Sequence, residues 1–365
     1  MKKKLSIILA LATSAALLGA CQSTTPADSS SAVSETSVSS VSETPETSTS
    51  TSAEATSTSS VEVSDTASDV TVRVAALKGP TTMGLLELLS ENDAGTSAQK
   101  YDFTMVTAAD EVVASMAKNE LDIALIPANL ASVLYQKTEK GISVIDINTL
   151  GVLYLVSADE TITDIPSLKG KTVVLTGKGT TPDYCLQYLL SKNGLSTADV
   201  TLEYKSEATE VVSDISADPS KIGLLPQPFA TVAQLQNDTL KSVCDLNAEW
   251  NKVSPESSLV TGVTVVDNDF LQANPDAVDT FLDEHEASSA YANENVDATA
   301  ELVVSAGIIE KAPVAAKAIP FCNITYIDGA DMQAKLSGYL QALYDLDPTA
   351  VGGQMPDEEF YYVQE

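Results

Sequence analysis

The sequence IALIPANLAS at residues 123–132 recurs as IGLLPQPFAT at residues 222–231, an offset of 99 residues. A second pair accompanies it, because KGPTT at residues 78–82 matches KGTT at residues 178–181 at nearly the same offset. In all four places an apolar run of strand length leads into a segment of helical periodicity. Two motifs that repeat in one order and at one spacing predict two similar α/β lobes.

The rest of the chain after Val70 supports this organisation. Short β-rich runs, such as Thr172 to Leu175 and Val200 to Tyr204, alternate with segments of helical length. We expect each lobe to be a mostly parallel sheet flanked by helices. The stretch from Val70 to Glu365 has room for two domains of roughly 150 residues each.

The N-terminus has the order of an export signal. Three lysines at residues 2–4 precede an apolar run from Leu5 to Leu18, which is shorter than the roughly 20 residues that span a bilayer. The small residues that follow the run and precede Cys21 resemble a bacterial lipobox. This implies a signal peptide at residues 1–20, a diacylated Cys21 and an extracytoplasmic protein that is lipid-anchored to the cell membrane.

Residues 22–69 contain no Lys, Arg, Gly or aromatic residue and consist mainly of Ser, Thr, Ala, Val, Glu and Asp. Such a composition cannot bury enough apolar surface to offset the entropy of ordering. We therefore predict that residues 21–69 are the lipidated cysteine and a disordered acidic tether.

The whole sequence has 20 basic and 51 acidic residues and a formal net charge of −31. This charge makes nucleic acid an implausible partner and indicates an acidic, well-solvated surface. Long-range electrostatic steering by this negative charge does not favour an anionic ligand.

The candidate binding site follows from the repeated motifs, because ligands of open α/β sheets bind beyond the carboxyl ends of the strands. Helix N-termini at these positions favour an anionic or hydrogen-bond-accepting ligand. Each Thr or Asn could instead serve only as a helix cap, and each aromatic residue could be a core residue. The predicted ligand-binding residues are Thr81, Thr82 and Asn129 from one lobe and Thr180, Thr181, Tyr184, Gln227 and Phe229 from the other.

Four further segments resemble a known family. They are IPSLKGK at residues 165–171, PQPF at 226–229, DLNAEW at 245–250, and NPDAV at 274–278 with a following Phe-Leu pair. In this order they resemble the binding proteins of nitrate, taurine, aliphatic-sulfonate and thiamine-pyrimidine importers, which have the two-lobed type II periplasmic-binding-protein fold.

This resemblance implies a chain that crosses between lobes near residues 151–157 and returns near residues 258–266. The lobes are then residues 70–155, residues 156–257, and a return to the first lobe with C-terminal helices at residues 258–365. It also implies a substrate-binding component of an ABC importer, expected to be monomeric, that captures a small molecule by lobe closure and delivers it to permease and ATPase subunits.

The sequence departs from parts of the family. It lacks the cysteine-rich motif of the thiamine-pyrimidine branch. Its single arginine, Arg73, lies inside the first strand and away from the expected cleft, which argues against an amino-acid receptor with a guanidinium clamp. Lys78 and Lys178 could contact an anion or face solvent, and we expect a small planar or anionic organic ligand.

No catalytic, metal or cofactor site is predicted. The single histidine, His285, lies in a charged stretch and is expected at the surface, without a second histidine for a zinc site or a triad. Cys185, Cys244 and Cys322 are expected to be buried thiols, with at most one disulfide among them. Trp250 is expected to pack in the core. The alternatives to an importer component are a sensor or adhesin and, less favoured, an enzyme on the same fold.

Overall fold

The computed structural model of the chain describes residues 70–363. The predicted signal peptide, Cys21 and the predicted tether lie outside the described residues.

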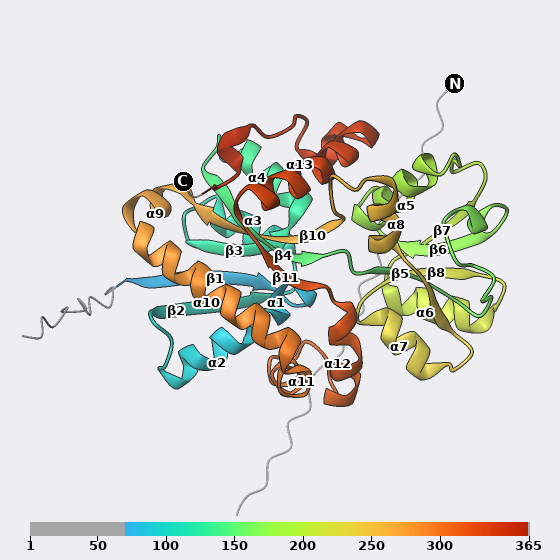
Figure 1. Cartoon of the computed structure of the whole chain (residues 1–365), viewed down its shortest axis with the longest axis horizontal. Coiled ribbons are helices and arrows are strands. Elements are labelled where there is room, and N and C mark those ends of the chain that lie inside the picture. The colour runs from blue at the N-terminus through green and yellow to red at the C-terminus, as the bar shows by residue number, and fades with distance from the viewer. Residues whose placement is uncertain (1–69, 364–365) are drawn as a thin grey trace, which may run out of the picture. The chain divides into compact units, whose positions relative to one another are not determined.

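The first lobe is built on a six-stranded sheet with the order β11-β4-β10-β3-β1-β2 (Figure 1). Its strands are β1 (Thr71–Leu77), β2 (Lys100–Val106), β3 (Ile123–Pro127), β4 (Ile142–Leu150), β10 (Val260–Asp267) and β11 (Ile324–Ile327). Its α-helices are α1 (Pro80–Met83), α2 (Leu86–Ala94), α3 (Ala109–Met116), α4 (Ala128–Lys137), α9 (Asn268–Ala273), α10 (Pro275–Glu294), α11 (Val296–Ser305), α12 (Ala312–Ala318) and α13 (Gly329–Leu346). Short 3₁₀ turns are η2 (Ile319–Phe321), η3 (Pro348–Val351) and η4 (Glu358–Phe360).

The second lobe has a five-stranded sheet with the order β7-β6-β8-β5-β9. Its strands are β5 (Leu153–Ser157), β6 (Thr172–Thr176), β7 (Thr201–Lys205), β8 (Ile222–Pro226) and β9 (Lys241–Asp245). Its helices are α5 (Thr181–Lys192), α6 (Ala208–Ala217), α7 (Phe229–Gln236) and α8 (Leu246–Val253), with the 3₁₀ turn η1 (Pro166–Leu168) before β6.

The repeated sequence motifs occupy equivalent places in the two sheets. In the first lobe β1 and β3 pair in parallel, and in the second lobe β6 and β8 do the same. The Lys-Gly motif follows β1 in one lobe and β6 in the other, and the Pro motif ends β3 and β8. The prediction of two similar α/β lobes is confirmed.

Most strands of each sheet run in one direction, as expected, but both sheets also contain reversed strands. In the first lobe β10 runs antiparallel to β3 and β4, and in the second β5 runs antiparallel to β8 and β9. The cause is the course of the chain, because Gly151 and Val152 connect β4 directly to β5 in the other sheet. Strand β5 therefore enters the second sheet from the side of the first lobe, at the end of the sheet where β8 finishes, and runs opposite to β8.

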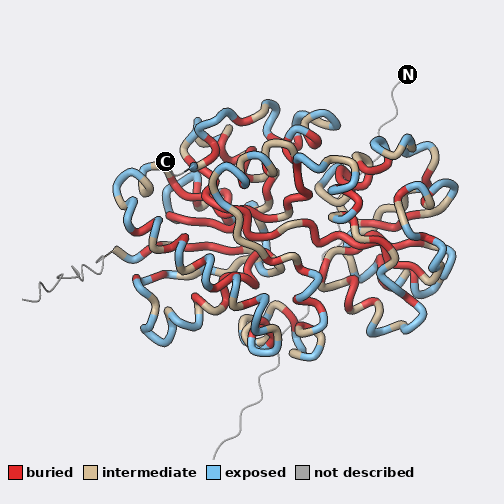
Figure 2. The backbone as a smooth tube through the Cα atoms, in the orientation of Figure 1, coloured by how far each residue is buried: buried red, intermediate tan, exposed pale blue. Residues whose placement is uncertain are grey.

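A continuous apolar core joins the two lobes. The strands at the centre of each sheet are buried along most of their length, as the tube in Figure 2 shows. Helix α13 buries Leu336, Tyr339 and Leu343 at a spacing of three and four residues and packs on both α4 and α5. One buried cluster therefore extends from the first lobe through α13 into the second.

Trp250 is a core residue, as expected. Its side chain is fully buried, stacks on Tyr188 with ring centroids 4.3 Å apart, and donates from Nε1 to Ser257 Oγ at 2.9 Å. The predicted thiols are also buried. Cys185, Cys244 and Cys322 are free, and burial raises the pKa of each to about 12.

The prediction of a surface position for His285 is wrong. The imidazole is fully buried and its Nδ1 lies 3.1 Å from Oδ2 of Asp146, which is also fully buried. The charged neighbours in the sequence are misleading, because His285 continues the buried face that α10 forms with Phe281, Leu282 and Ser289.

Candidate functional site

The starts of α4 and α5 meet between the two lobes. Asn129, in the first turn of α4, belongs to the Pro motif of the first lobe, and Thr181, at the start of α5, belongs to the Lys-Gly motif of the second. Thr181 Oγ1 lies 3.5 Å from Asn129 Oδ1, while Asn129 Nδ2 donates to Ala350 O at 3.2 Å. The structure thus brings together one predicted residue from each lobe.

A second polar contact between the lobes lies one helical turn further along α5. The Tyr184 hydroxyl donates to Asp347 Oδ2 at 2.8 Å, just after the end of α13. Burial, and then this carboxylate, raise the pKa of Tyr184 to about 12. Hydrogen bonds from the Thr349 hydroxyl and from Tyr184 lower the pKa of Asp347.

A third contact lies on the other side of the crossing strand. The Tyr154 hydroxyl of β5 donates to Phe321 O of η2 at 2.9 Å, and the two rings pack edge to face. We call these three contacts, together with the crossing residues Gly151 and Val152, the seam.

The remaining predicted residues of the second lobe flank the seam. The exposed Thr180 donates from Oγ1 to Gly177 O at 2.6 Å and so closes the loop before α5. Gln227 is buried, and its backbone N–H donates to Val152 O at 2.9 Å. Phe229 is half-buried and packs on the apolar cluster that contains Tyr154. Gln227 and Phe229 therefore lie beside the crossing strand.

Thr81 and Thr82 have mostly internal contacts. Both hydroxyls donate to Leu77 O, at the end of β1. Thr82 is fully buried, and the Thr81 side chain packs against Gly262 of β10. In this structure they stabilise the turn after β1 without capping α1, which has Gly79 at its N-cap and no side-chain cap hydrogen bond.

Asn247, at the start of α8, is a site candidate that the sequence prediction missed. It packs against Gly151, where an added Cβ would lie 2.9 Å from Asn247 Cβ. Its Oδ1 is buried and has no hydrogen-bond partner, and such an atom is costly to leave unpaired. Asp245 caps the same helix by accepting from the backbone N–H of Asn247 at 2.8 Å. An aspartate that follows an apolar run and precedes a helix is a capping signal that can be read from the sequence.

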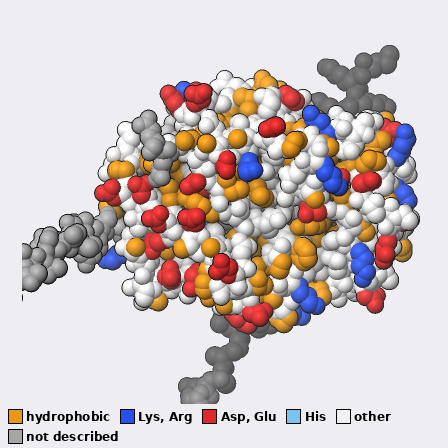
Figure 3. All heavy atoms as spheres, in the orientation of Figure 1, with side chains coloured by type: hydrophobic (Ala, Val, Ile, Leu, Met, Phe, Trp, Pro, Cys, Tyr) orange, Lys and Arg blue, Asp and Glu red, His pale blue; other side chains and the backbone are white. Residues whose placement is uncertain are grey.

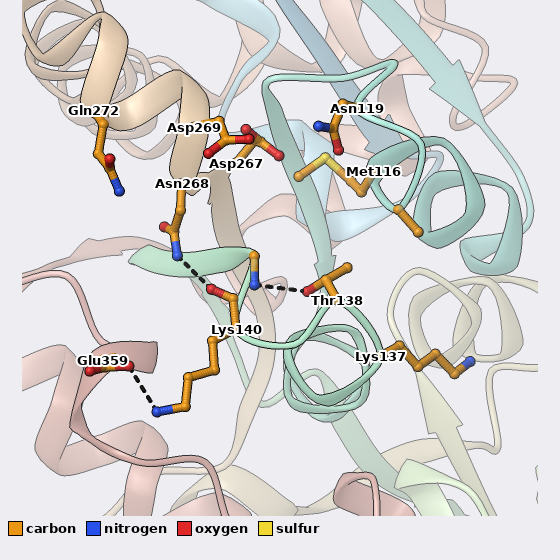
Figure 4. Close-up of a pocket in the computed structure, with 12 residues that line it drawn as sticks. Met116, Asn119, Lys137, Thr138, Lys140, Asp267, Asn268, Asp269, Gln272 and Glu359 are labelled. Atoms are coloured by element: carbon orange, nitrogen blue, oxygen red, sulfur yellow. Dashed lines mark hydrogen bonds and ion pairs between the residues drawn. The ribbon is translucent and has the colours of Figure 1, made fainter.

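A hollow in the described part of the structure lies elsewhere. It has a volume of about 740 Å³ and lies at the amino ends of β3 and β4, on the opposite edge of the first sheet from the seam (Figure 4). Figure 4 shows Asp267 and Asp269 facing Asn119 across it, with Lys140 paired to Glu359 at 2.8 Å. Its residues come from a single lobe, so lobe closure would not enclose a ligand there.

The electrostatic character of the exposed surface agrees with the composition. Acidic side chains are spread over the face shown in Figure 3 and do not gather in one patch. Within residues 70–363 no helix is long and apolar enough to cross a membrane.

Comparison with known proteins agrees with the fold and with the sequence motifs. Residues 134–299 match the family model described as NMT1/THI5 like, a range that contains the crossing strand, the whole second lobe and the return strand β10. No curated protein matches the sequence.

Solved structures extend the likeness to both lobes. An ABC transporter protein from Parabacteroides distasonis is 25% identical with a TM-score of 0.68, covering 81% of this chain and 100% of that one. The periplasmic aliphatic sulphonate binding protein SsuA from Escherichia coli is 15% identical with a TM-score of 0.64, covering 80% and 92%. The alkanesulfonate-binding protein SsuA from Xanthomonas axonopodis pv. citri, bound to MOPS, is 13% identical with a TM-score of 0.53, covering 79% and 94%. The resemblance and the two-lobed periplasmic-binding-protein fold expected from the sequence are confirmed.

Proposed function

We propose that this protein is the extracytoplasmic substrate-binding component of an ABC importer. It captures a small organic molecule between its two lobes and delivers it to permease and ATPase subunits in the membrane. The observation that carries the proposal is the direct pairing, across the seam, of Asn129 in the first turn of α4 with Thr181 at the start of α5. The fold that this chain shares with periplasmic binding proteins supports the same role.

Capture and release follow from the connections between the lobes. The crossing at Gly151, the return into β10 and the packing of α13 on α5 join the two lobes. Bending at the two crossings separates Asn129 from Thr181 and opens the seam to solvent. The proposed ligand contacts are then Asn129, Thr180, Thr181, Tyr184, Gln227, Phe229 and Asn247, with Thr81 and Thr82 shaping the loop after β1.

The proposal includes attachment to the membrane through a diacylated Cys21. The predicted tether at residues 22–69 then holds a monomeric two-lobed protein at roughly 35 to 40 Å from its anchor, the random-coil span for its length. This distance lets the lobes reach a permease in the same membrane. Two acyl chains are enough for stable anchoring.

Substitutions at the seam test the function. We expect Thr181→Ala to weaken ligand binding by about 0.5 to 1.5 kcal/mol, and Phe229→Ala to weaken it by about 2 kcal/mol or more. Calorimetry with the small molecule recovered from the denatured protein measures both changes. Thr201→Ala, at the distant start of β7, is the matched control and should bind as the unaltered protein does.

Two further readouts separate the alternatives. If Phe229 is only a core residue, Phe229→Ala lowers the melting temperature of the ligand-free protein by several degrees and leaves the affinity unchanged. The recovered molecule should keep its mass after incubation with the protein, and a converted product would favour an enzyme. Unchanged affinity in both seam variants would show that the ligand binds elsewhere.

A further inference from the structure

Some of the backbone N–H groups beside the seam already bind carboxylates of the chain. At the start of α8, Asp245 Oδ1 accepts from the N–H groups of Asn247 at 2.8 Å and Ala248 at 3.4 Å. In the loop before α5, Asp183 Oδ2 accepts from Gly179 N at 2.8 Å, and Asp183 is itself buried. An anionic ligand at either helix start would have to displace a resident carboxylate or lie beside it.

Cationic side chains do not compensate for these carboxylates. Lys178, the basic residue nearest in sequence to the start of α5, points its Nζ over the Tyr204 ring at 5.4 Å from the centroid. Lys78 lies beside the exposed Gly307, and Arg73 pairs with Asp122 on the far side of the sheet. Among the ion pairs of residues 70–363, none involves a residue of the seam.

The groups at and beside the seam whose pKa values are shifted are also partly buried and have carboxylates as neighbours. The Tyr184 pKa is raised by burial, by Asp347 and by Asp183, and the Tyr154 pKa by burial and by Asp245. Burial and Glu249 raise the pKa of Asp245. A partly desolvated region in which Asp183, Asp245 and Asp347 form none of the ion pairs of residues 70–363 disfavours a further negative charge.

We propose that the ligand captured at the seam is an uncharged or cationic organic molecule, and that sulfonates and other strong anions are rejected. This inference rests on the proposed function. Neutral polar groups remain for such a ligand, namely the amides of Asn129 and Asn247 and the Thr181 hydroxyl. A ligand with a carbonyl or ring-nitrogen acceptor and an N–H donor matches these groups.

A thiol at the seam measures this selectivity without knowledge of the ligand. In a Cys21→Ser background, Thr181→Cys is treated with trimethylammonioethyl methanethiosulfonate or with the isosteric sulfonatoethyl reagent at 0.15 M salt. Thr201→Cys is the control for the net charge of the protein, because Thr201 is exposed at the start of β7 in the same lobe. The parent Cys21→Ser protein gives the background of the three buried thiols.

We expect the ratio of cationic to anionic reaction rates to be at least about tenfold higher at residue 181 than at residue 201, because low-dielectric surroundings strengthen local charges. Equal ratios, or a lower ratio at residue 181, would overturn the inference. Calorimetry with benzenesulfonate, benzamide and benzamidine, three planar probes that differ in charge, is the second arm. Tightest binding of benzenesulfonate at the seam would overturn the inference but leave the proposed function standing.

The two failures remain distinguishable. A protein from which no small molecule is recovered, and which binds none of the three probes, contradicts the proposed function. In that case the thiol rate ratio still decides whether the seam rejects anions.

Discussion

At the scale of single residues, the buried pair of Asp146 and His285 is the most consequential polar feature outside the seam. Asp146 Oδ1 also accepts from Thr264 Oγ1 at 2.8 Å, and Thr264 in turn accepts from Asn148 Nδ2 at 3.1 Å. All four side chains are buried, so each depends on its neighbour for a hydrogen bond. The chain of contacts joins α10 to the centre of the first sheet.

We predict that His285→Ala destabilises the protein by about 3 to 5 kcal/mol, because the substitution leaves the Asp146 carboxylate buried with one partner fewer. Urea unfolding of the ligand-free protein measures the change. Glu286→Ala, the exposed neighbour on α10, should stay within about 0.5 kcal/mol of the unaltered protein. A loss below about 1 kcal/mol for His285→Ala would mean that the pair contributes little.

At the scale of secondary-structure elements, the contact between α5 and the end of α13 holds the lobes together without a ligand. We predict that Tyr184→Phe increases the radius of gyration of the ligand-free protein in X-ray scattering, because it removes the hydrogen bond to Asp347. Tyr204→Phe is a matched control, since Tyr204 donates to Asp183 at 2.9 Å within the second lobe. An equal increase in both variants would show that the effect is not specific to the seam.

The same contact predicts a pH dependence. The pKa of Asp347 is lowered in the folded protein, so the carboxylate remains charged above its ordinary pKa of about 3.9 and is protonated only as the pH falls through the lowered value. The Tyr184 pKa of about 12 keeps the phenol as a donor throughout. The radius of gyration should therefore be constant from about pH 8 to pH 5 and rise only below about pH 4. A rise near pH 6 would point to another group.

The elements also show what the sequence can and cannot predict. The repeated motifs predict the two lobes and place Asn129 and Thr181 at the starts of helices, because strand-to-helix turns are local features. The direction of β5 and β10 is not local, since it depends on which sheet each strand joins. For the same reason the charged neighbours of His285 suggest exposure, while the helix packs its other face on the sheet. Asn247 was missed because only the packing of Gly151 brings it to the seam.

At the scale of the whole molecule, we expect a ligand to enter and leave only when the lobes separate. The lobes share a continuous core through α13, and the seam is closed by contacts from both sides. Opening must therefore break the contact between Asn129 and Thr181. The pair Asn129→Cys and Thr181→Cys makes this event controllable, because the original side-chain oxygens lie 3.5 Å apart.

The most direct test is to join these two thiols with a short bifunctional cross-linker in the Cys21→Ser background and to follow uptake of the recovered small molecule by calorimetry. We predict that cross-linking the empty protein abolishes uptake, whereas cross-linking after ligand addition traps the ligand through extended dialysis. The double variant without cross-linker should still bind and release it. Uptake and release at unchanged rates in the cross-linked protein would contradict binding between the lobes.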